Sequence, residues 1–319
     1  MGTIAQEITR IQGAKSDLKT SIINKGVQVP SNALIDDYAS YVDQIQQGGG
    51  SGNPFDGVYL EYLLSTSNQN TSGAGRFLDN LDLLYNADFS NVTNQTFNYY
   101  AYGVKTTSEN VQKIFNIFTK ALRNASTIYS TTFSSVFYNF STTDSDRIIT
   151  FKPYYNSSNS NLTFNRFFSY LGSKNTSGVK MKVDIDFDDI NVNSLAFQAN
   201  DDFNFYGDRA EIRIFNLPMN KLHGRTAINF GGSTSSDAIK EFTFKGDLTA
   251  YSSTNYPQNL YFKTATGMTL DKFINMFNSL GSNLTGYTVT VTIPTSIYNQ
   301  LTEAQKAIVT DKGYVLASA

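Results

Sequence analysis

The hydrophobic positions of this chain follow two alternating periods, and residues 273–293 show both. In the first part of this stretch the apolar residues have the i, i+3, i+4, i+7 spacing of one helix face; they are Phe273, Met276, Phe277 and Leu280. In the second part the apolar residues alternate with threonines; they are Tyr287, Val289, Val291 and Ile293. This pattern predicts a short helix that leads into a half-buried strand.

The same unit recurs three times earlier in the chain. Each copy pairs a stretch of helical spacing with a strand-like stretch: 164–171 with 179–187, 133–140 with 148–151, and 114–121 with 128–129. Strand-like segments continue between Asp188 and Thr269 without a helical half; they are 211–215, 227–230, 241–244 and 260–262. Segments spaced roughly 14 to 33 residues apart predict an α+β repeat protein, a solenoid of short strands and helical turns with outer loops of variable length.

The first 47 residues have a different pattern, which predicts a helical segment. Apolar residues alternate four and three positions apart, and Lys15 alone breaks the series, which consists of Ile4, Ile8, Ile11, Leu18 and Ile22. Isoleucine at both seam positions favours a coiled coil of three strands. The alternative is an amphipathic helix that folds onto its own neighbour, and the sequence leaves both interpretations open.

A second helix and a linker complete this segment. Pro30 and Ser31 predict a helix start, and the expected apolar face consists of Leu34, Tyr38, Val42 and Ile45. Residues 48–54, GGGSGNP, have the composition of a flexible linker. The predicted organisation is therefore a helical anchor and oligomerisation segment at 1–47, a linker at 48–54 and a solenoid at 55–319.

The end of the solenoid carries its own signals. Thr302 and Gln305 form a capping box for a short polar helix, and Gly313 ends that helix before a last edge strand at 314–316. A polar helix over an open end keeps a stacked array from pairing with its neighbours. We therefore expect a C-terminal cap at about 294–319.

Composition excludes several functional classes. The net charge is −2 and no basic run is present, so we expect no nucleic-acid partner. The absence of cysteine removes disulfides and thiolate zinc sites. No apolar run approaches a membrane span, and we expect no membrane insertion and no signal peptide. Asn, Ser, Thr and aromatic residues, the last at 14%, suit a protein outside a cell or on a particle.

Catalytic signatures are sparse, and we expect neither enzymatic activity nor a cofactor. The single histidine, His223, lies in a loop-like context without a Gly-x-Ser-x-Gly elbow. A phosphate-binding loop of the Gly-x-x-x-x-Gly-Lys type is also missing. An exposed loop residue is the simpler interpretation of His223.

One acidic run is a candidate site. Asp184, Asp186 and Asp188 share the strand face opposite the apolar residues, and three carboxylates in line suit calcium or the acid and nucleophile of a glycosidase. The simpler interpretation is a solvated strand face. Asp201, Asp202 and Asp208 follow in a loop and would complete a cluster.

Tyrosines in loops rich in Asn and Ser are the candidate ligand-binding residues. Aromatic faces beside amides stack on sugar rings and also bind protein surfaces. The candidates are Tyr99, Tyr100, Tyr102, Tyr154 and Tyr155. Some of them are expected to stack inside the solenoid instead.

Residues 1–47 resemble the N-terminal segment of many tailed-bacteriophage structural proteins of the fibre and tail-associated type. Three motifs carry the resemblance: Lys-x-x-(Leu/Ile)-x-x-x-Ile at 15–22, Lys-Gly-Val-x-Val-Pro at 25–30 and Tyr-x-x-x-(Val/Ile)-x-x-Ile at 38–45. The resemblance implies that this segment fastens the protein to the particle or to its own oligomer.

Further phrases resemble irregular leucine-rich repeats of bacterial surface proteins and phage fibres. They are Leu-x-x-Leu-Asp at 78–82, Phe-Ser-Asn-Val-Thr-Asn at 89–94 and Phe-x-x-Met-Phe at 273–277. The closing segment, 293–316, is also similar to that of phage proteins with such repeats. The match to the repeat is partial, because no helical half is visible between Asp188 and Thr269.

Together these features predict a non-enzymatic virion protein, a head or tail fibre or decoration protein. Its expected partners are other capsid or tail proteins, two further copies in a homotrimer, and a host-surface glycan or protein. One alternative is a tailspike-like enzyme that degrades polysaccharide with Asp184 and Asp186. The other is a bacterial surface adhesin with leucine-rich repeats.

Overall fold

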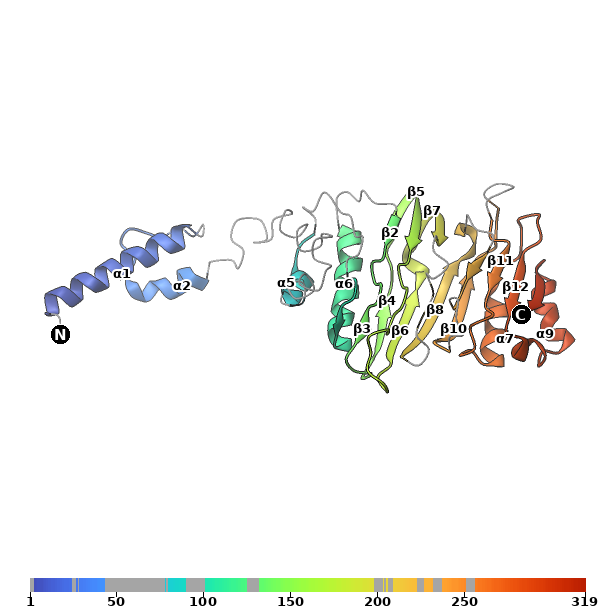
Figure 1. The fold of residues 1–319 in the computed structure, drawn as a ribbon. Coiled ribbons are helices and arrows are strands. Elements are labelled where there is room, and N and C mark those ends of the chain that lie inside the picture. Colours follow the sequence, from blue (N-terminus) through green and yellow to red (C-terminus); the bar gives the residue numbers. More distant parts are fainter. Residues whose placement is uncertain are drawn as a thin grey trace. The chain divides into compact units, whose positions relative to one another are not determined.

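The computed structural model of the protein describes residues 3–24, 27, 29–43, 78, 80–89, 101–124, 132–197, 203, 205, 209–222, 227–231, 237–250 and 256–319. Side chains are described for all of these except 24, 43, 124 and 156–160. The chain divides into two compact units, Met1–Leu60 and Glu61–Ala319 (Figure 1). The predicted linker at 48–54 lies outside the described residues.

The N-terminal unit is a long helix that folds partly onto the segment after it. α1 spans Ile4–Asn24, η1 spans Ile35–Asp37 and α2 spans Tyr38–Asp43. Ile22 is 1% exposed and packs in a small apolar cluster with Val27, Val29, Ala33 and Tyr38. Lys15, on the same face of α1, donates a hydrogen bond from Nζ to the carbonyl oxygen of Ala33 at 2.5 Å.

The rest of the predicted seam is exposed within the single chain. Ile4, Ile8 and Ile11 are 82%, 51% and 50% exposed, and Leu18 is 41% exposed. Folding onto the neighbouring segment therefore applies to Lys15 and Ile22 in the C-terminal half of α1. The other four residues leave an apolar stripe available for association, and the coiled coil there remains a prediction.

The second helix begins later than Pro30 and Ser31 predict. A turn closes first, with the Ala33 N–H bonded to the Pro30 carbonyl, and the Asp37 carboxylate then accepts from the Leu34 N–H at 2.9 Å. Helical structure starts at Ile35 as a result. Of the expected apolar face, Tyr38 is buried, Leu34 and Val42 are exposed, and Ile45 lies outside the described residues.

The second unit winds parallel strands into stacked coils. β4 (Ile148–Phe151), β6 (Met181–Asp186), β8 (Ala210–Pro218) and β10 (Ile239–Lys245) form one sheet in the order β10-β8-β6-β4. Its register aligns Ile149, Val183, Ile212 and Ile239, and all four side chains are buried. Each coil thus contributes one apolar side chain to a ladder through the core, as a solenoid requires.

Three further parallel sheets run along the same stack, with the orders β13-β12-β11-β9, β2-β5-β7 and β1-β3. Their strands are β1 (Lys105–Thr106), β2 (Thr132–Ser134), β3 (Ser141–Thr142), β5 (Tyr155–Asn165), β7 (Ile190–Phe197), β9 (Ile228–Asn229), β11 (Asn259–Tyr261), β12 (Thr290–Ile293) and β13 (Val315–Ser318). The result is a parallel β-solenoid of about four turns. The prediction of an α+β chain with a helical start and a solenoid is confirmed at this level.

Two of the four predicted helices are present in full. α6 spans Ser108–Asn124 and contains the apolar face at 114–121, and α7 spans Leu270–Ser279 and begins at the N-cap Thr269. The strand after α7 is shorter than predicted, because Tyr287 lies in a bend before β12 and is 40% exposed. The predicted strand at 128–129 lies outside the described residues.

The other two predicted helices, at 133–140 and 164–171, are wrong. Both stretches begin with the last residues of a strand, β2 or β5, and continue as turns. Left-handed backbone occurs at Ser135 and Asn139 in the first stretch and at Arg166 and Tyr170 in the second. In the first stretch the N–H groups of Ser135, Phe137 and Asn139 bond to carbonyls of the next coil, as from Phe137 to Phe167 at 2.9 Å.

Local composition explains why only α6 and α7 are helical. The stretch 133–140 consists of Phe, Ser, Val, Tyr and Asn, which have weak helix propensity, whereas 108–124 includes Glu, Gln, Lys, Ala, Leu and Arg. The apolar spacing nevertheless identifies the inward residues correctly. Those at 133–140 and 164–171 are all buried: Phe133, Val136, Phe137, Phe140, Phe164, Phe167, Phe168 and Leu171.

Phenylalanine rings fill the first coils of the core. Phe137 has ring centroids 4.8 Å from Phe115, 5.3 Å from Phe118, 5.2 Å from Phe151 and 5.2 Å from Phe167. Several of these pairs are edge-to-face, the arrangement that aromatic quadrupoles favour. The helix, the turns and the sheet are therefore joined by one aromatic cluster.

The predicted C-terminal helix and edge strand are both present. The capping box of Thr302 and Gln305 starts α9 (Glu303–Thr310), which follows the short α8 (Thr295–Tyr298). Gly313 has a φ of 85°, and β13 after it is an edge strand of its sheet. Figure 1 shows α9 and α7 beside the last strands, at the opposite end of the solenoid from α6.

Candidate binding site

The polar face of α6 forms one wall of the candidate site. Gln112, Asn116, Thr119 and Arg123 follow one another four, three and four residues apart, so they share one side of the helix. The opposite side, which includes Ile114, is buried in the core. The α6 N-terminus is held by the next coil, because the Asp144 carboxylate accepts from the Ser108 N–H at 3.0 Å.

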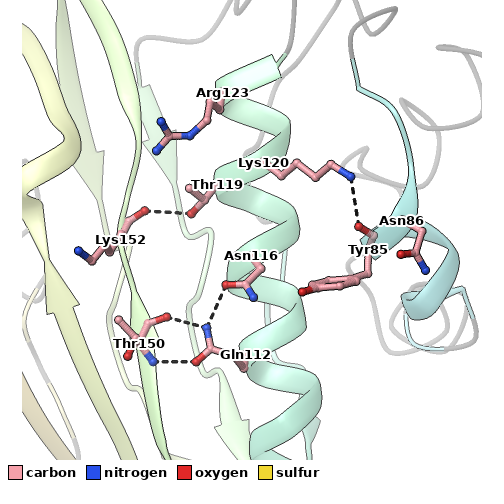
Figure 2. A pocket seen from close by; sticks show the side chains of 9 residues that line it. All are labelled: Tyr85, Asn86, Gln112, Asn116, Thr119, Lys120, Arg123, Thr150 and Lys152. Carbon is pink, nitrogen blue, oxygen red and sulfur yellow. Dashed lines mark hydrogen bonds between the residues drawn. The ribbon is translucent and has the colours of Figure 1, made fainter.

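α6 also covers the open edge of the main sheet, where β4 is the last strand. The Gln112 side chain accepts from the Thr150 N–H and donates to the Thr150 carbonyl, both at 2.8 Å. The Thr119 hydroxyl donates to the Lys152 carbonyl at 2.9 Å. Figure 2 shows these side chains reaching from α6 to the strand, so edge groups that would pair with another chain are occupied.

The short helix α5 (Leu81–Asn86) supplies the opposite wall. Asp82 pairs with Lys113 of α6 at 2.6 Å, and Lys120 donates from Nζ to the Tyr85 carbonyl at 3.3 Å. Leu81 and Leu84 of α5 are buried. These contacts place Tyr85 and Asn86 beside α6.

A pocket of about 640 Å³ lies between α5, α6 and the end of β4. Its volume is in the range of small-ligand sites. The described residues that line it are Tyr85, Asn86, Gln112, Asn116, Thr119, Lys120, Arg123, Thr150 and Lys152 (Figure 2). This lining contains three cationic side chains together with amides and hydroxyls, and it contains no carboxylate.

Groups outside the pocket orient two of its cations. Arg123 donates from Nη2 to Asp189 at 2.8 Å, and its guanidinium lies 4.1 Å from the ring centroid of Tyr154. Lys152 pairs with Asp186 at 3.2 Å, and this hydrogen bond raises the pKa of Lys152 above its usual value. Each of these side chains is therefore paired with a carboxylate outside the lining.

The predicted acidic row forms ion pairs between coils. Asp184 receives two hydrogen bonds of 2.6 Å from Arg213 on β8, and Asp186 receives one of 2.9 Å from Asn216. Asp188 pairs with Lys245, the last residue of β10. In the part of the chain that the structure describes, no group of three or more His, Asp or Glu side chains is placed to hold a metal ion. The acidic row thus has Lys, Arg and Asn partners.

Asp186 is also held as an anion. Burial alone would raise the pKa of its carboxyl, but hydrogen bonds from Asn216, from Lys152 and from the Asp188 N–H outweigh burial and lower the pKa below its usual value. A glycosidase acid needs the opposite shift, since it must carry a proton near neutral pH. The hydrogen bonds from Asn216 and Lys152 make Asp186 part of the contacts between coils.

The candidate tyrosines separate into different environments. Tyr102 stacks on Tyr138 with ring centroids 5.1 Å apart, and Tyr138 meets Tyr170 edge-on at 5.1 Å, so three turns contribute to one half-buried ladder. Tyr154 packs under Arg123 beside the pocket. Tyr155 is 4% exposed and contacts Phe133 in the core, where no ligand reaches it.

Several predicted site residues lie outside the described part of the chain. They are Tyr99, Tyr100, Asp201, Asp202, Asp208 and His223.

The pocket residues were not among the predicted site residues, although α6 carries a sequence signal for them. The polar stripe from Gln112 to Arg123 has helical spacing as regular as the apolar stripe behind it. Its approach to Thr150 and Lys152 depends on the packing of α6 against β4, which has no local sequence signature.

Comparison with models of protein families, with curated proteins and with solved structures gives no match to this chain. Among the described helices, none has the length and apolar character that a bilayer crossing requires. The functional proposal therefore depends on the chain's own residues and on the resemblance of its N-terminal segment.

Proposed function

We propose that this chain is a non-enzymatic structural protein of a virus particle, a fibre or decoration protein of the tailed-bacteriophage type. The exposed apolar stripe of α1, formed by Ile4, Ile8, Ile11 and Leu18, carries the proposal. Such a stripe on a helix in its own compact unit needs partner helices, and its spacing suits a three-stranded coiled coil. The N-terminal unit would thus join three copies and fasten them to capsid or tail proteins.

The solenoid is the part that would meet the host surface. Its strands stack in register, so side chains on successive coils form regular rows, as at Asp184 and Arg213 on β6 and β8. Stacked repeats of this kind, here proposed to be of the irregular leucine-rich type, present extended surfaces for binding a glycan or a protein. A solenoid on a trimeric stem would present three such surfaces, and linked sites bind more tightly than single ones.

Peptide mass spectrometry of purified virus particles tests this proposal. The host culture is induced or infected, and intact particles are separated by density from free protein and cell debris. We expect peptides of this chain in the particle fraction, at a constant ratio to the major capsid protein across the density peak. Recovery only in the cell fraction, or a ratio that varies across the peak, would contradict the assignment to a particle.

A further inference from the structure

We infer that the pocket between α5, α6 and β4 binds a saccharide that carries an anionic group. The inference rests on the proposed role in surface attachment and specifies the ligand for it. Lys120, Arg123 and Lys152 line the pocket. Asp189 and Asp186, which pair with Arg123 and Lys152, are not among the described lining residues, so the lining itself is positively charged. A carboxylate or phosphate is the group that these cations would hold.

The cations retain donors for such a group. Among the described residues Arg123 uses one of its five N–H donors, on Asp189, which lies outside the lining. Lys120 reaches only the exposed carbonyl of Tyr85 at 3.3 Å, and its ammonium also lies 5.8 Å from the ring centroid of Phe89. Hydrogen bonds from these groups to an anion are stronger than those they make with neutral carbonyls.

The neutral lining favours a polyhydroxylated ligand. Asn116 accepts a 3.0 Å hydrogen bond from Gln112 through Oδ1, which leaves its Nδ2 group toward the pocket (Figure 2). Asn86 donates to the Asp82 carbonyl, so its side-chain oxygen remains an acceptor. Tyr85 adds a partly exposed ring and a phenol. Amides and a phenol match sugar hydroxyls, and the tyrosine ring offers a stacking surface.

The α6 wall of the pocket is fixed by hydrogen bonds to the neighbouring strand. Gln112 and Thr119 are bonded to the backbone of β4 and its end, so α6 keeps its distance from the strand. Asp189 and Tyr154 fix Arg123 from two sides. A preformed site loses less entropy when it binds, which matters for a weakly binding sugar.

Isothermal titration of the full-length protein with three probes tests the inference. The probes are an oligogalacturonate, a glucose monophosphate and a neutral maltose-type oligosaccharide. Saturable binding of either anionic probe, at least tenfold tighter than the neutral one and weakened by added salt, supports the inference. A preference between the two anionic probes identifies the source as carboxylate or phosphate. Absence of binding by both, or equal binding of the neutral probe, overturns it.

Two matched variants locate the site. Lys120→Met with Lys152→Met removes two positive charges from the pocket and keeps the methylene stems, and we expect at least a tenfold loss of affinity. Lys221→Met with Lys263→Met removes the same charge from residues that do not line the pocket, and affinity should stay within twofold. Unchanged melting temperatures confirm folding in each case. An equal loss in both variants, or no loss in the first, overturns the inference.

The result of the titration can be distinguished from the result of the particle experiment that tests the proposed function. A chain found in particles that binds neither anionic probe keeps its structural role and loses the pocket assignment. A chain that binds an anionic probe but is absent from particles keeps the pocket and loses the virion role.

Discussion

At the scale of single residues, the coils are joined by a few buried polar groups. Asn175 is buried, accepts from the Thr142 N–H at 2.9 Å, and donates to the carbonyls of Val179 and Arg209 at 3.2 and 3.1 Å. One side chain therefore satisfies backbone groups of three successive coils. Such groups are costly to leave unpaired in the interior.

Replacement of Asn175 by leucine should be strongly destabilising. We expect a loss of about 3 kcal/mol in the free energy of unfolding, because the buried side chain also loses its own hydrogen bonds, and the Thr142 N–H and the Val179 carbonyl lose this partner. The Arg209 carbonyl loses one of two donors and keeps the Met181 N–H. Denaturant unfolding followed by circular dichroism measures the loss. The control is Asn278→Leu on the exposed side of α7, for which a change within about 0.5 kcal/mol is expected. Equal effects of the two substitutions would contradict the bridging role.

Two glycines allow the energetic cost of left-handed backbone to be measured separately from the cost of a steric clash. Gly172 and Gly178 have φ angles of 79° and 84°. A Cβ at Gly172 would lie 2.6 Å from the Arg209 carbonyl oxygen, whereas one at Gly178 has no atom within 4 Å. Gly178→Ala should cost about 1 kcal/mol for the left-handed backbone alone.

Gly172→Ala should cost at least twice as much, because it also pushes adjacent coils apart. Thermal melting of the two alanine variants in parallel gives the comparison. Similar melting temperatures would show that the coils tolerate the added methyl group and that the close approach is not needed for stacking.

At the scale of elements, α6 protects the first strand of the main sheet. Gln112→Leu should leave the N–H and carbonyl of Thr150 without their side-chain partner and cost about 1–2 kcal/mol. It should also increase self-association, because an open edge pairs with other chains. Asn116→Leu, one turn further along the same face, contacts no edge group and is the control. Static light scattering against concentration distinguishes the two variants.

The N-terminus of α6 gives a pH-dependent contribution to stability. Burial alone would raise the pKa of Asp144, but hydrogen bonds from the Ser108 side chain and N–H and from the Asp146 N–H lower it below its usual value. Because the pKa is lower in the folded state, the contribution is complete above the unfolded pKa and is lost as pH falls through the folded pKa.

Asp144→Asn should therefore reduce stability by about 1 kcal/mol near neutral pH and flatten the loss of stability in acid. Melting temperatures of both proteins between about pH 7 and pH 3 measure this. Curves that remain parallel throughout this range would mean that Asp144 does not titrate with folding.

Comparison of the elements shows what local sequence determines. Strands at 148–151 and 181–186, the helices at 114–121 and 273–279, and the capping box at Thr302 were all predictable from spacing and end signals. The turns at 133–140 and 164–171 were not, because i, i+3, i+4 spacing describes an inward face equally well in a stacked turn. Helix propensity is the better guide there, because Phe, Ser, Tyr and Asn are weak helix formers.

The pocket was beyond sequence reasoning for a related reason. Arg123 and Lys152 are 29 positions apart in the sequence, and both line the pocket because α6 packs against β4. The acidic row was predictable only in part. Its alternation with apolar residues was correct, whereas Arg213 and Lys245 as its partners depend on the register of the coils.

At the scale of the whole molecule, the chain has two compact units, and we propose that assembly belongs to the first and recognition to the second. Residues 4–18 offer an apolar stripe that the single chain leaves uncovered, and the solenoid is a second unit in which α6 is bonded to the edge of β4. A covered edge is a poor polymerising surface. Association is therefore expected to occur through the N-terminal helix.

The mass of the full-length protein in solution, measured by multi-angle light scattering, tests this most directly. We predict a trimer for the wild type and for Gln6→Asp with Thr9→Asp, which alters the opposite face of α1. We predict a monomer for Ile8→Asp with Ile11→Asp, because two carboxylates would enter the apolar seam. A wild-type monomer at all concentrations, or a trimer that survives the Ile8 and Ile11 substitutions, would contradict assembly through α1.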